Sequence, residues 1–381
     1  MIYLDNNATT KIDTRVLEAM VPFLTDNFAN AASTHPFGLG AYEAVKNARQ
    51  QVADLIGSET NEIIFTSGAT EAINLAIKGV AENYCNKGKH IITVKTEHKA
   101  VLDTCEYLET KGFEVTYLPV QADGLIDLQV LKEAIRADTI LVSVMLVNNE
   151  IGVIQPVKEI ADIAHEAGAI FMTDGTQAVG KIEVDVDDLG IDLMCFSGHK
   201  MYAPKGVGAL FFRQRRPRRV KLEALIHGGG HERSLRSGTL NVPGIIALGK
   251  ACEIAKTEMS ENQDKIKDLR DYLETELLKI DDTKVNGNRS QRIYSTSNIL
   301  FKGVDSDAII MGLEGIAVSN GSACTSASID PSHVLMALGL SENNAFSCIR
   351  FSLSKYNTRN ELEILINLLG VLIPNLKGML T

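Results

Sequence analysis

A cysteine near the end of the chain stands in a run of small side chains. Residues 319–328 read S-N-G-S-A-C-T-S-A-S, so Cys324 has no neighbour larger than asparagine. A cysteine that fills a core is usually flanked by large apolar residues, as Cys195 is in D-L-M-C-F. Small residues give a loop few packing anchors, and the thiolate is the nucleophilic form of cysteine. The pattern indicates that Cys324 is a thiol that can move and react.

A lysine and an aspartate follow two apolar segments in the middle of the chain. Asp174 closes A-I-F-M-T, and Lys200 ends the run D-L-M-C-F-S-G-H-K. Taken alone, the first could be a helix N-cap and the second a surface charge. If the two segments are neighbouring strands, however, both side chains face one pocket. Pyridoxal 5'-phosphate needs that pair, because a lysine forms a Schiff base with its aldehyde and a carboxylate keeps its ring nitrogen protonated.

A third segment is suited to binding an anion. T-S-G-A-T-E, residues 66–71, leads into the helix-forming run N-L-A-I-K-G-V. The backbone N–H groups, the helix dipole and the Thr70 hydroxyl can bind a phosphate, although the same run could be an ordinary capping box. Ser197 and His199 could donate to the same phosphate. His98 stands between an expected strand and helix, where a histidine is often a cap. It becomes a candidate only because the other candidate residues occupy similar positions at strand ends.

These side chains need a scaffold that gathers them, and the hydrophobic pattern predicts one. Helical periods at 38–56 and 70–84 alternate with short apolar runs at 62–65, 90–94, 114–118, 140–147, 169–173, 192–196 and 207–212. This alternation predicts an α/β fold with a mostly parallel central sheet flanked by helices, and ligands bind such sheets at the carboxyl ends of the strands. A helical stretch over 242–280 leads to a smaller α+β part. We predict a large domain of residues 15–254 and a small domain of residues 1–14 and 255–381, which carries the Cys324 loop at about 319–330.

Composition excludes several classes of protein. The 48 acidic residues exceed the 38 basic ones, for a net charge of -10, which argues against nucleic acid as a partner. The N-terminus does not resemble a signal peptide, and no run approaches the roughly 20 apolar residues of a membrane span. We therefore expect a cytoplasmic protein that does not bind membranes. The six cysteines form no C-x-x-C pair or Cys/His cluster, so we expect neither a metal site nor a disulfide framework.

In their order, the motifs of this chain resemble those of cysteine desulfurases of the class-V aminotransferase family, the NifS/IscS-like enzymes. They are I-Y-L-D-N-N-A-T-T, T-S-G-A-T-E, T-E-H-K-A-V-L, N-N-E-I-G, D-G-T-Q, S-G-H-K-M-Y-A-P-K-G-V-G, H-G-G-G-H-E-R, R-S-G-T, G-S-A-C-T-S and I-R-F-S-L. The resemblance covers essentially the whole chain and implies the pyridoxal-phosphate fold type I. The run D-G-T-Q departs from the more common D-A-A-Q, but the aspartate and the glutamine keep their spacing.

The resemblance implies a role for each matching residue. Lys200 would hold pyridoxal 5'-phosphate, Asp174 would pair with the ring nitrogen, Gln177 would contact the ring hydroxyl, and His98 would stack on the ring and assist proton transfer. Asn149 would lie beside the ring near the substrate, and Arg350 would bind the substrate carboxylate. The cofactor phosphate would be held by Ala69, Thr70, Ser197, His199 and, from the other subunit, Thr239.

The same resemblance implies a reaction and its partners. Lys200 would move a proton at the α-carbon of L-cysteine, and Cys324 would attack the substrate sulfur, leaving a persulfide on the enzyme and releasing L-alanine. His98 could help to deprotonate the thiol. The enzyme would be a homodimer with a shared active site, and it would pass the sulfur to an iron-sulfur scaffold protein or another acceptor.

Two other functions share part of this pattern. A selenocysteine lyase or another aminotransferase-like enzyme of this fold would need the lysine and the aspartate but not Cys324 on a mobile loop. A non-catalytic regulator would carry an added DNA-binding module, and motifs that run from residue 3 to residue 353 leave no room for one.

Three features of the sequence do not belong to the predicted active site. The run R-Q-R-R-P-R-R, residues 213–219, could be a solvated loop or a docking site for an acidic partner. H-G-G-G-H, residues 227–231, resembles a metal motif but lacks supporting carboxylates, so we interpret it as backbone near the cofactor or a dimer interface. The five cysteines other than Cys324 are expected to be structural.

Overall fold

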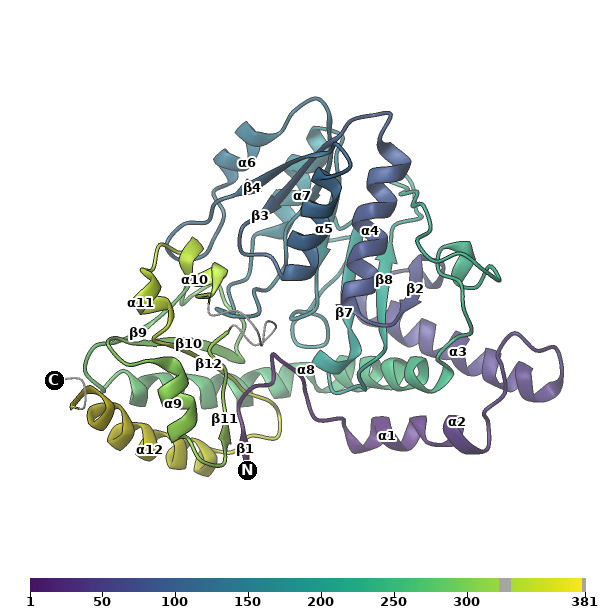
Figure 1. Ribbon diagram of the computed structural model, residues 1–381. Helices are drawn as coiled ribbons and strands as arrows, with labels where there is room; N and C mark the ends of the chain where they lie inside the picture. Colours follow the sequence, from purple (N-terminus) through teal and green to yellow (C-terminus); the bar gives the residue numbers. More distant parts are fainter. Residues whose placement is uncertain (322–329, 379–381) are drawn as a thin grey trace.

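A seven-stranded sheet forms the centre of the larger part of the molecule (Figure 1). The computed structural model describes residues 1–321 and 330–378, and the sheet has the strand order β2-β8-β7-β6-β5-β3-β4. Neighbouring strands are parallel except at β8, which is antiparallel to both β2 and β7. In sheet order the strands are β2 (Ile63–Thr66), β8 (Gly208–Phe212), β7 (Leu193–Ser197), β6 (Ile170–Asp174), β5 (Thr139–Ser143), β3 (His90–Val94) and β4 (Glu114–Leu118). The predicted α/β fold with a mostly parallel sheet is confirmed.

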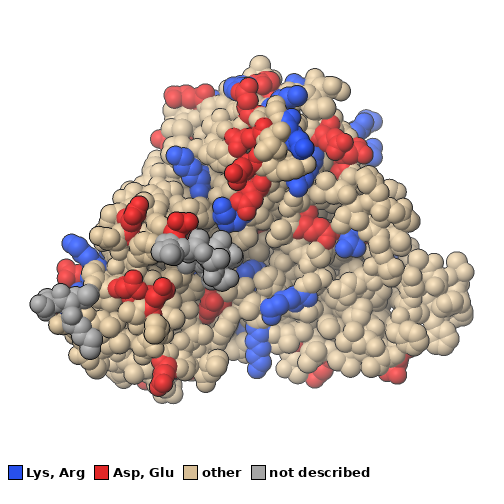
Figure 2. Space-filling view, in the orientation of Figure 1, with Lys and Arg blue, Asp and Glu red and all other residues tan. Residues whose placement is uncertain are grey.

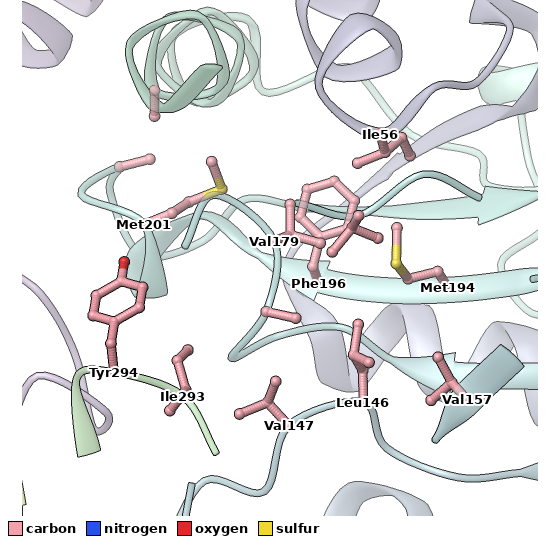
Figure 3. Packing of buried hydrophobic residues seen from close by; sticks show 14 of the residues in the cluster. Ile56, Leu146, Val147, Val157, Val179, Met194, Phe196, Met201, Ile293 and Tyr294 are labelled. Atoms are coloured by element: carbon pink, nitrogen blue, oxygen red, sulfur yellow. The ribbon is translucent and has the colours of Figure 1, made fainter. Parts of the chain in front are cut away.

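Helices cover both faces of this sheet because the strands alternate their side chains between two apolar layers. In β7, Met194 and Phe196 belong to the core on the side of α3 and α7, whereas Leu193 and Cys195 belong to the core on the side of α4 and α5. Figure 3 shows Met194 and Phe196 among Ile56, Val157 and Val179 on the first side. The helices of this part are α1 (Thr14–Met20), α2 (Pro22–Thr25), α3 (Pro36–Ile56), α4 (Ala69–Tyr84), α5 (Lys99–Glu109), α6 (Leu128–Ala134) and α7 (Val157–Glu166).

The strand expected at 140–147 ends earlier, at Ser143. Beyond it the chain remains extended beside β6, since the Val144 and Leu146 backbone N–H groups donate to the carbonyls of Met172 and Asp174 at 3.1 Å each. It then turns at Asn148, whose side-chain oxygen accepts from two backbone N–H groups. This extension places residues 145–149 next to the end of β6.

The smaller part is built on an antiparallel sheet with the order β12-β10-β9. The first strand of the chain, β1, pairs in parallel with β11 in a separate two-stranded sheet, and Asp5 bridges Ser352. Helix α8 (Val242–Leu277) packs along α3 and α1 and also contacts β10 and α12, so it runs beneath both parts (Figure 1). The proposed domain boundaries stay a prediction. The remaining elements are β1 (Ile2–Tyr3), β9 (Thr283–Val285), β10 (Thr296–Phe301), β11 (Ile316–Ala317), β12 (Cys348–Ser352), α9 (Ser306–Gly312), α10 (His333–Ala337), α11 (Glu342–Ala345) and α12 (Arg359–Gly378).

The arginine run at 213–219 is largely engaged within the chain. Arg213 is buried and pairs with Asp187 at 2.6 Å, and Arg215 pairs with the same carboxylate and with Glu62. Arg218 pairs with Asp192 at 3.2 Å. These contacts tie the loop after β8 to neighbouring segments, whereas Arg216 and Arg219 of the run are exposed.

The part of the chain that the structure describes contains neither a membrane-spanning helix nor a cluster of metal-binding side chains. None of its helices combines the length and the apolar character that crossing a membrane requires. In residues 1–321 and 330–378, no cluster of three or more His, Cys, Asp or Glu side chains could hold a metal ion.

On the face shown in Figure 2, acidic and basic side chains are interspersed rather than gathered by sign.

At Gly208 the sheet comes close to the loop that precedes α4. Gly208 pairs with both Thr66 and Ser197, and a Cβ there would lie 2.5 Å from the carbonyl oxygen of Phe196 and 2.7 Å from the Cα of Gly68. Both neighbours are backbone atoms, so neither can move without shifting a strand or the start of α4.

We predict that Gly208→Ala lowers the free energy of unfolding by about 1–3 kcal/mol, because the added methyl group overpacks this contact. Chemical denaturation of the purified variant measures this. Gly370→Ala is the matched control, since Gly370 lies exposed in α12 with nothing within 4 Å of an added Cβ. That control should be about 0.5–1 kcal/mol more stable than the unmodified protein. Equal stability of Gly208→Ala and the unmodified protein would show that the sheet relaxes around the methyl group.

Candidate active site

A cavity of about 490 Å³ lies at the carboxyl ends of the central strands, where the smaller part of the chain meets the sheet. Residues from both parts and from the N-terminal segment line it. Of the residues singled out in the sequence, the cavity brings together Lys200, Asp174, Gln177, His98, Asn149, Ala69, Thr70, Ser197, His199 and Arg350. Thr239 is exposed and is not among the described residues that line this cavity. Cys324 lies outside the described residues. The chemical roles of all these residues stay predictions.

Lys200 and Asp174 face the cavity because their strands are neighbours. β6 and β7 are paired in parallel, with Asp174 opposite Cys195, and Lys200 ends the short 3-10 turn Gly198–Lys200 that follows β7. Asp174 is buried, and its Oδ1 accepts from the backbone N–H of Thr176 at 2.9 Å. No helix follows it, so the alternative interpretation as a helix N-cap is wrong.

The N-terminal segment supplies the contacts that hold the lysine amine. Lys200 Nζ donates to the carbonyl oxygens of Asn7 and Ala8, both at 2.6 Å. Asn7 in turn donates from its side chain to Asn149 O at 3.0 Å and to Thr296 Oγ1 at 2.9 Å. The motif D-N-N-A therefore connects the amine to both parts of the molecule. Periodicity does not reveal this connection, because the segment forms no helix or long strand and acts through its carbonyl groups.

The anion-binding segment has the predicted geometry at the start of α4. Ala69 and Thr70 are the first two residues of the helix, and the Ala69 backbone N–H lies 3.3 Å from Ser197 Oγ. Glu71 accepts from the Ser67 backbone N–H at 2.9 Å and pairs with Arg236 at 2.8 Å. The alternative interpretation as a capping box is wrong, because the N-cap of α4 is Gly68, which makes no side-chain cap hydrogen bond. The run remains a potential phosphate site.

His199 stands beside this segment in its neutral form. Burial, together with the charges of Lys200, Lys205 and Lys181, lowers its pKa from 6.5 to about 4. Its Nδ1 lies 3.1 Å from Thr9 Oγ1. Neutral at pH 7, the ring can donate one hydrogen bond and accept another.

His98 is both a helix cap and a residue of the cavity. Its Nδ1 accepts from the backbone N–H of Ala100 at 3.1 Å, which makes it the N-cap of α5. A neutral ring that accepts at Nδ1 carries its proton at Nε2. The cap therefore orients the ring and selects its tautomer.

Sequence reasoning missed a buried acid directly behind this histidine. Glu97 is fully buried, and burial together with the nearby charge of Asp174 raises its pKa well above the ordinary value. Its Oε1 accepts from the backbone N–H of Met145 at 2.5 Å, and its carbonyl oxygen accepts from His333 Nε2 at 2.9 Å. Glu97 thus links the loop of His98 to the extended segment after β5 through its carboxyl and to α10 through its backbone carbonyl.

Arg350 projects from β12 and is held in place on two sides. Its Nη2 donates to Asp5 Oδ1 and its Nη1 to the carbonyl of Asn149, at 2.6 and 3.1 Å. Its buried Nε has no hydrogen-bond partner among the described residues. A guanidinium with unused donor capacity on a cavity wall suits a carboxylate ligand.

Gly321, the last described residue before the Cys324 segment, also has a specific reason to be glycine. Its φ is 87°, and a Cβ there would lie 2.6 Å from the Oε2 of Glu150. The same carboxyl oxygen accepts from Ser332 Oγ, after the segment. Glu150 is fully buried, and burial raises its pKa. A left-handed backbone and a close side chain therefore both favour glycine at this position.

The donor set fits pyridoxal 5'-phosphate. The cavity has the size of a small-molecule site and offers an amine, a buried carboxylate, a helix N-terminus with hydroxyl groups, and a guanidinium with an unpartnered Nε. When bound, the cofactor would be held by Lys200 and Asp174 at its ring and by the residues at the start of α4 and the end of β7 at its phosphate.

The family model described as aminotransferase class-V matches residues 2–365. The chain belongs to the class-V aminotransferase family. Its curated relatives include the cysteine desulfurase IscS of Haemophilus influenzae strain PittGG, 54% identical over 381 residues, which covers 99% of this chain and 94% of the relative. The IscS of Methylococcus capsulatus is 52% identical over 377 residues, with 99% and 93% covered.

Solved structures are also similar to this chain. A NifS-like protein superposes with a TM-score of 0.89 at 38% identity, covering 100% of this chain and 99% of that one. A structure described as SspA in complex with cysteine has a TM-score of 0.84 at 39% identity, covering 94% and 100%. The resemblance to pyridoxal-phosphate-dependent cysteine desulfurases that the motifs indicated is confirmed.

The half-buried, neutral His199 should make the stability of the apoprotein fall in mild acid. Its pKa is about 4 in the folded protein and 6.5 when unfolded, so between these values the unfolded chain binds the extra proton. We predict that this contribution is lost as the pH falls from 6.5 towards 4. Urea denaturation at a series of pH values should give a shallower decline for His199→Gln. A decline equally steep in that variant would show that other groups account for the acid sensitivity.

Proposed function

We propose that this protein is a cysteine desulfurase that removes the sulfur of L-cysteine, releases L-alanine and holds the sulfur as a persulfide on Cys324. The observation that carries the proposal is the meeting of Lys200, Asp174 and Arg350 around one cavity. Amine and carboxylate suit the cofactor, and the guanidinium suits the carboxylate of an amino acid. The relatives named cysteine desulfurase, and a similar structure with bound cysteine, support this substrate.

Each group of the cavity has a defined task in this reaction. The bound cofactor would withdraw electrons from the α-carbon of the substrate and so weaken its bond between Cβ and sulfur. Lys200 would move a proton at the α-carbon, and the carbonyls of Asn7 and Ala8 hold its amine ready. Arg350 would bind the substrate carboxylate and thereby set which bond of the amino acid faces the lysine.

The sulfur acceptor must be a thiol that can form a thiolate. Four of the five described cysteines are buried, and burial raises the pKa of each thiol, to about 12 for Cys105 and Cys348. The thiols of Cys195 and Cys252 are affected in the same direction. These four are poor nucleophiles. Cys324 would attack the substrate sulfur, so that one S–S bond forms, the C–S bond breaks, and the carbon takes up a proton to become alanine.

The enzyme is further proposed to work as a homodimer. Helices α1 and α2, the start of α3 and the segment joining α2 to α3 expose an apolar surface of Leu17, Val21, Leu24, Phe28, Phe37, Leu39 and Tyr42. In Figure 2 the region over these helices, at the lower right, carries few charged side chains. Isolated proteins rarely leave such a patch uncovered. Thr239, exposed outside its own cavity, would then reach the phosphate of the partner's site.

In the cell, the sulfur would pass from Cys324 to an iron-sulfur scaffold protein or another acceptor. All five described cysteines are free thiols, which suits a reducing compartment such as the cytoplasm.

Cys324→Ser should retain the visible absorption of bound pyridoxal 5'-phosphate and lose sulfide and alanine release by at least about 100-fold, because serine cannot accept sulfur. Cys85→Ser, at the half-buried cysteine that caps the C-terminal end of α4, is the matched control and should remain active. Intact-mass analysis after incubation with L-cysteine should find one added sulfur on the unmodified protein and none on Cys324→Ser. Amino-group transfer from cysteine to a keto acid, without sulfide, would instead indicate an aminotransferase.

Phe37→Glu should shift the protein from dimer to monomer in sedimentation velocity, because it places a charge on the apolar surface of α1 to α3. Phe37 is 73% exposed. Met311→Glu is the control, since Met311 is 84% exposed on α9, away from that surface. A Phe37→Glu protein that remains dimeric at nanomolar concentration would place the dimer interface elsewhere.

A further inference from the structure

A buried lysine stands behind the cavity with no carboxylate to neutralise it. Lys181 is 8% exposed and forms no ion pair among the described residues. Its Nζ donates to the side-chain oxygen of Gln177 at 2.6 Å. Lys181 itself is not among the described residues that line the 490 Å³ cavity, whereas Gln177 is. The lysine therefore reaches the cavity only through the glutamine.

Keeping an ammonium group here is costly. Burial, together with the positive charges of Lys200 and Arg350, lowers the pKa of Lys181 from 10.5 to about 7. The other ionisable side chains lining the space beside it are Tyr202 and Tyr294, which are neutral at this pH because burial raises their pKa values. An apolar side chain of similar volume would avoid this cost, so the position has a reason other than stability to hold a lysine.

The hydrogen bonds at the oxygen and at the nitrogen of the Gln177 amide supply that reason. Its oxygen accepts from Lys181, and its nitrogen donates to the carbonyl oxygen of Asn7 at 3.0 Å. Lys181 donates to the amide oxygen and the Asn7 carbonyl can only accept from the amide nitrogen, so the two neighbours specify the same orientation of the amide. The same Asn7 oxygen accepts from Lys200 Nζ, which places the chain Lys181, Gln177, Asn7 and Lys200 in one hydrogen-bonded series.

Besides its hydrogen bond to Gln177, Lys181 lines a second cavity of about 20 Å³ together with Asn6, Thr10 and Ser295. The buried Ser295 Oγ has no hydrogen-bond partner among the described residues. A space of this size holds one water molecule, which would bridge the ammonium group and the hydroxyl.

We propose that Lys181 is a positioning residue that orients the Gln177 amide so that its free N–H faces the cavity and donates to the ring oxygen of the cofactor. The inference rests on the proposed function, because it takes pyridoxal 5'-phosphate as the ligand. Without Lys181 only the Asn7 carbonyl holds the amide in this orientation, so the flipped orientation, in which the amide oxygen would oppose the ring oxygen, costs less free energy.

A double-mutant cycle on the apoprotein tests this link, with the dissociation constant for pyridoxal 5'-phosphate as the readout. Lys181→Met and Gln177→Ala should each weaken binding about tenfold, and the double variant should bind no more weakly than Gln177→Ala alone. Fully additive effects would overturn the proposal, as would unchanged binding by Lys181→Met. Lys132→Met, at an exposed lysine on α6, should bind as the unmodified protein does.

Denaturation separates positioning from a structural role. Apo Lys181→Met should be at least as stable as the unmodified apoprotein at pH 7, because it removes a buried ammonium group. If the methionine variant does not fold, Lys181→Arg, which keeps a charged donor, should retain binding within about threefold; a tenfold loss in that variant would contradict the proposal. The unmodified protein, measured in parallel, must bind the cofactor and release sulfide from cysteine. If it does not, the proposed function fails, which is a different result from a Lys181 variant that behaves like the unmodified protein.

Discussion

The arrangement of the active site depends on the hydrogen bonds between the Lys200 amine and the carbonyl oxygens of Asn7 and Ala8. The lysine comes from the end of β7 in the large sheet, and the carbonyls come from the first residues of the chain. Asn7 also binds Thr296 of β10, and its backbone N–H donates to Ser352 Oγ of β12. One short segment thus connects the amine to the sheet that carries Arg350. The distance between the amine and the guanidinium follows from this connection.

Around this centre, burial favours the neutral forms of ionisable groups. Burial near Asp174 raises the pKa of Glu97, and partial burial among lysines lowers the pKa of His199 to about 4. A neutral acid and a neutral imidazole can donate and accept hydrogen bonds without adding charge to the pocket. The pocket can therefore hold an anionic cofactor and a zwitterionic substrate while few of its own charges compete. The helix N-terminus at α4 supplies positive potential without another titrating group.

For His98, both alternatives that the sequence left open describe the structure, because His98 caps α5 and also lines the cavity. For residues 66–71 the capping box does not form, since the N-cap of α4 is Gly68 without a side-chain cap hydrogen bond, while Ala69 and Thr70 line the cavity. A cap and a binding residue need not be different, because a helix N-terminus in an α/β sheet lies at the same edge as the ligand. For Asp174 the cap interpretation failed because the chain after it forms a tight turn instead of a helix.

The sequence by itself determined the α/β class, most strand positions and the polar segments that end the strands, since hydrophobic periodicity and strand-end chemistry are local properties of the chain. The ends of 90–94 and 114–118 agreed residue for residue with β3 and β4. The contacts that cross the chain could only be known from the tertiary structure: Asn7 with Lys200, Asp5 with Arg350, and Lys181 with Gln177. The pKa values of buried groups, too, could only be known from the tertiary structure. They depend on desolvation and on charges brought together by folding, and neither quantity is a property of the residue or of its neighbours in the sequence.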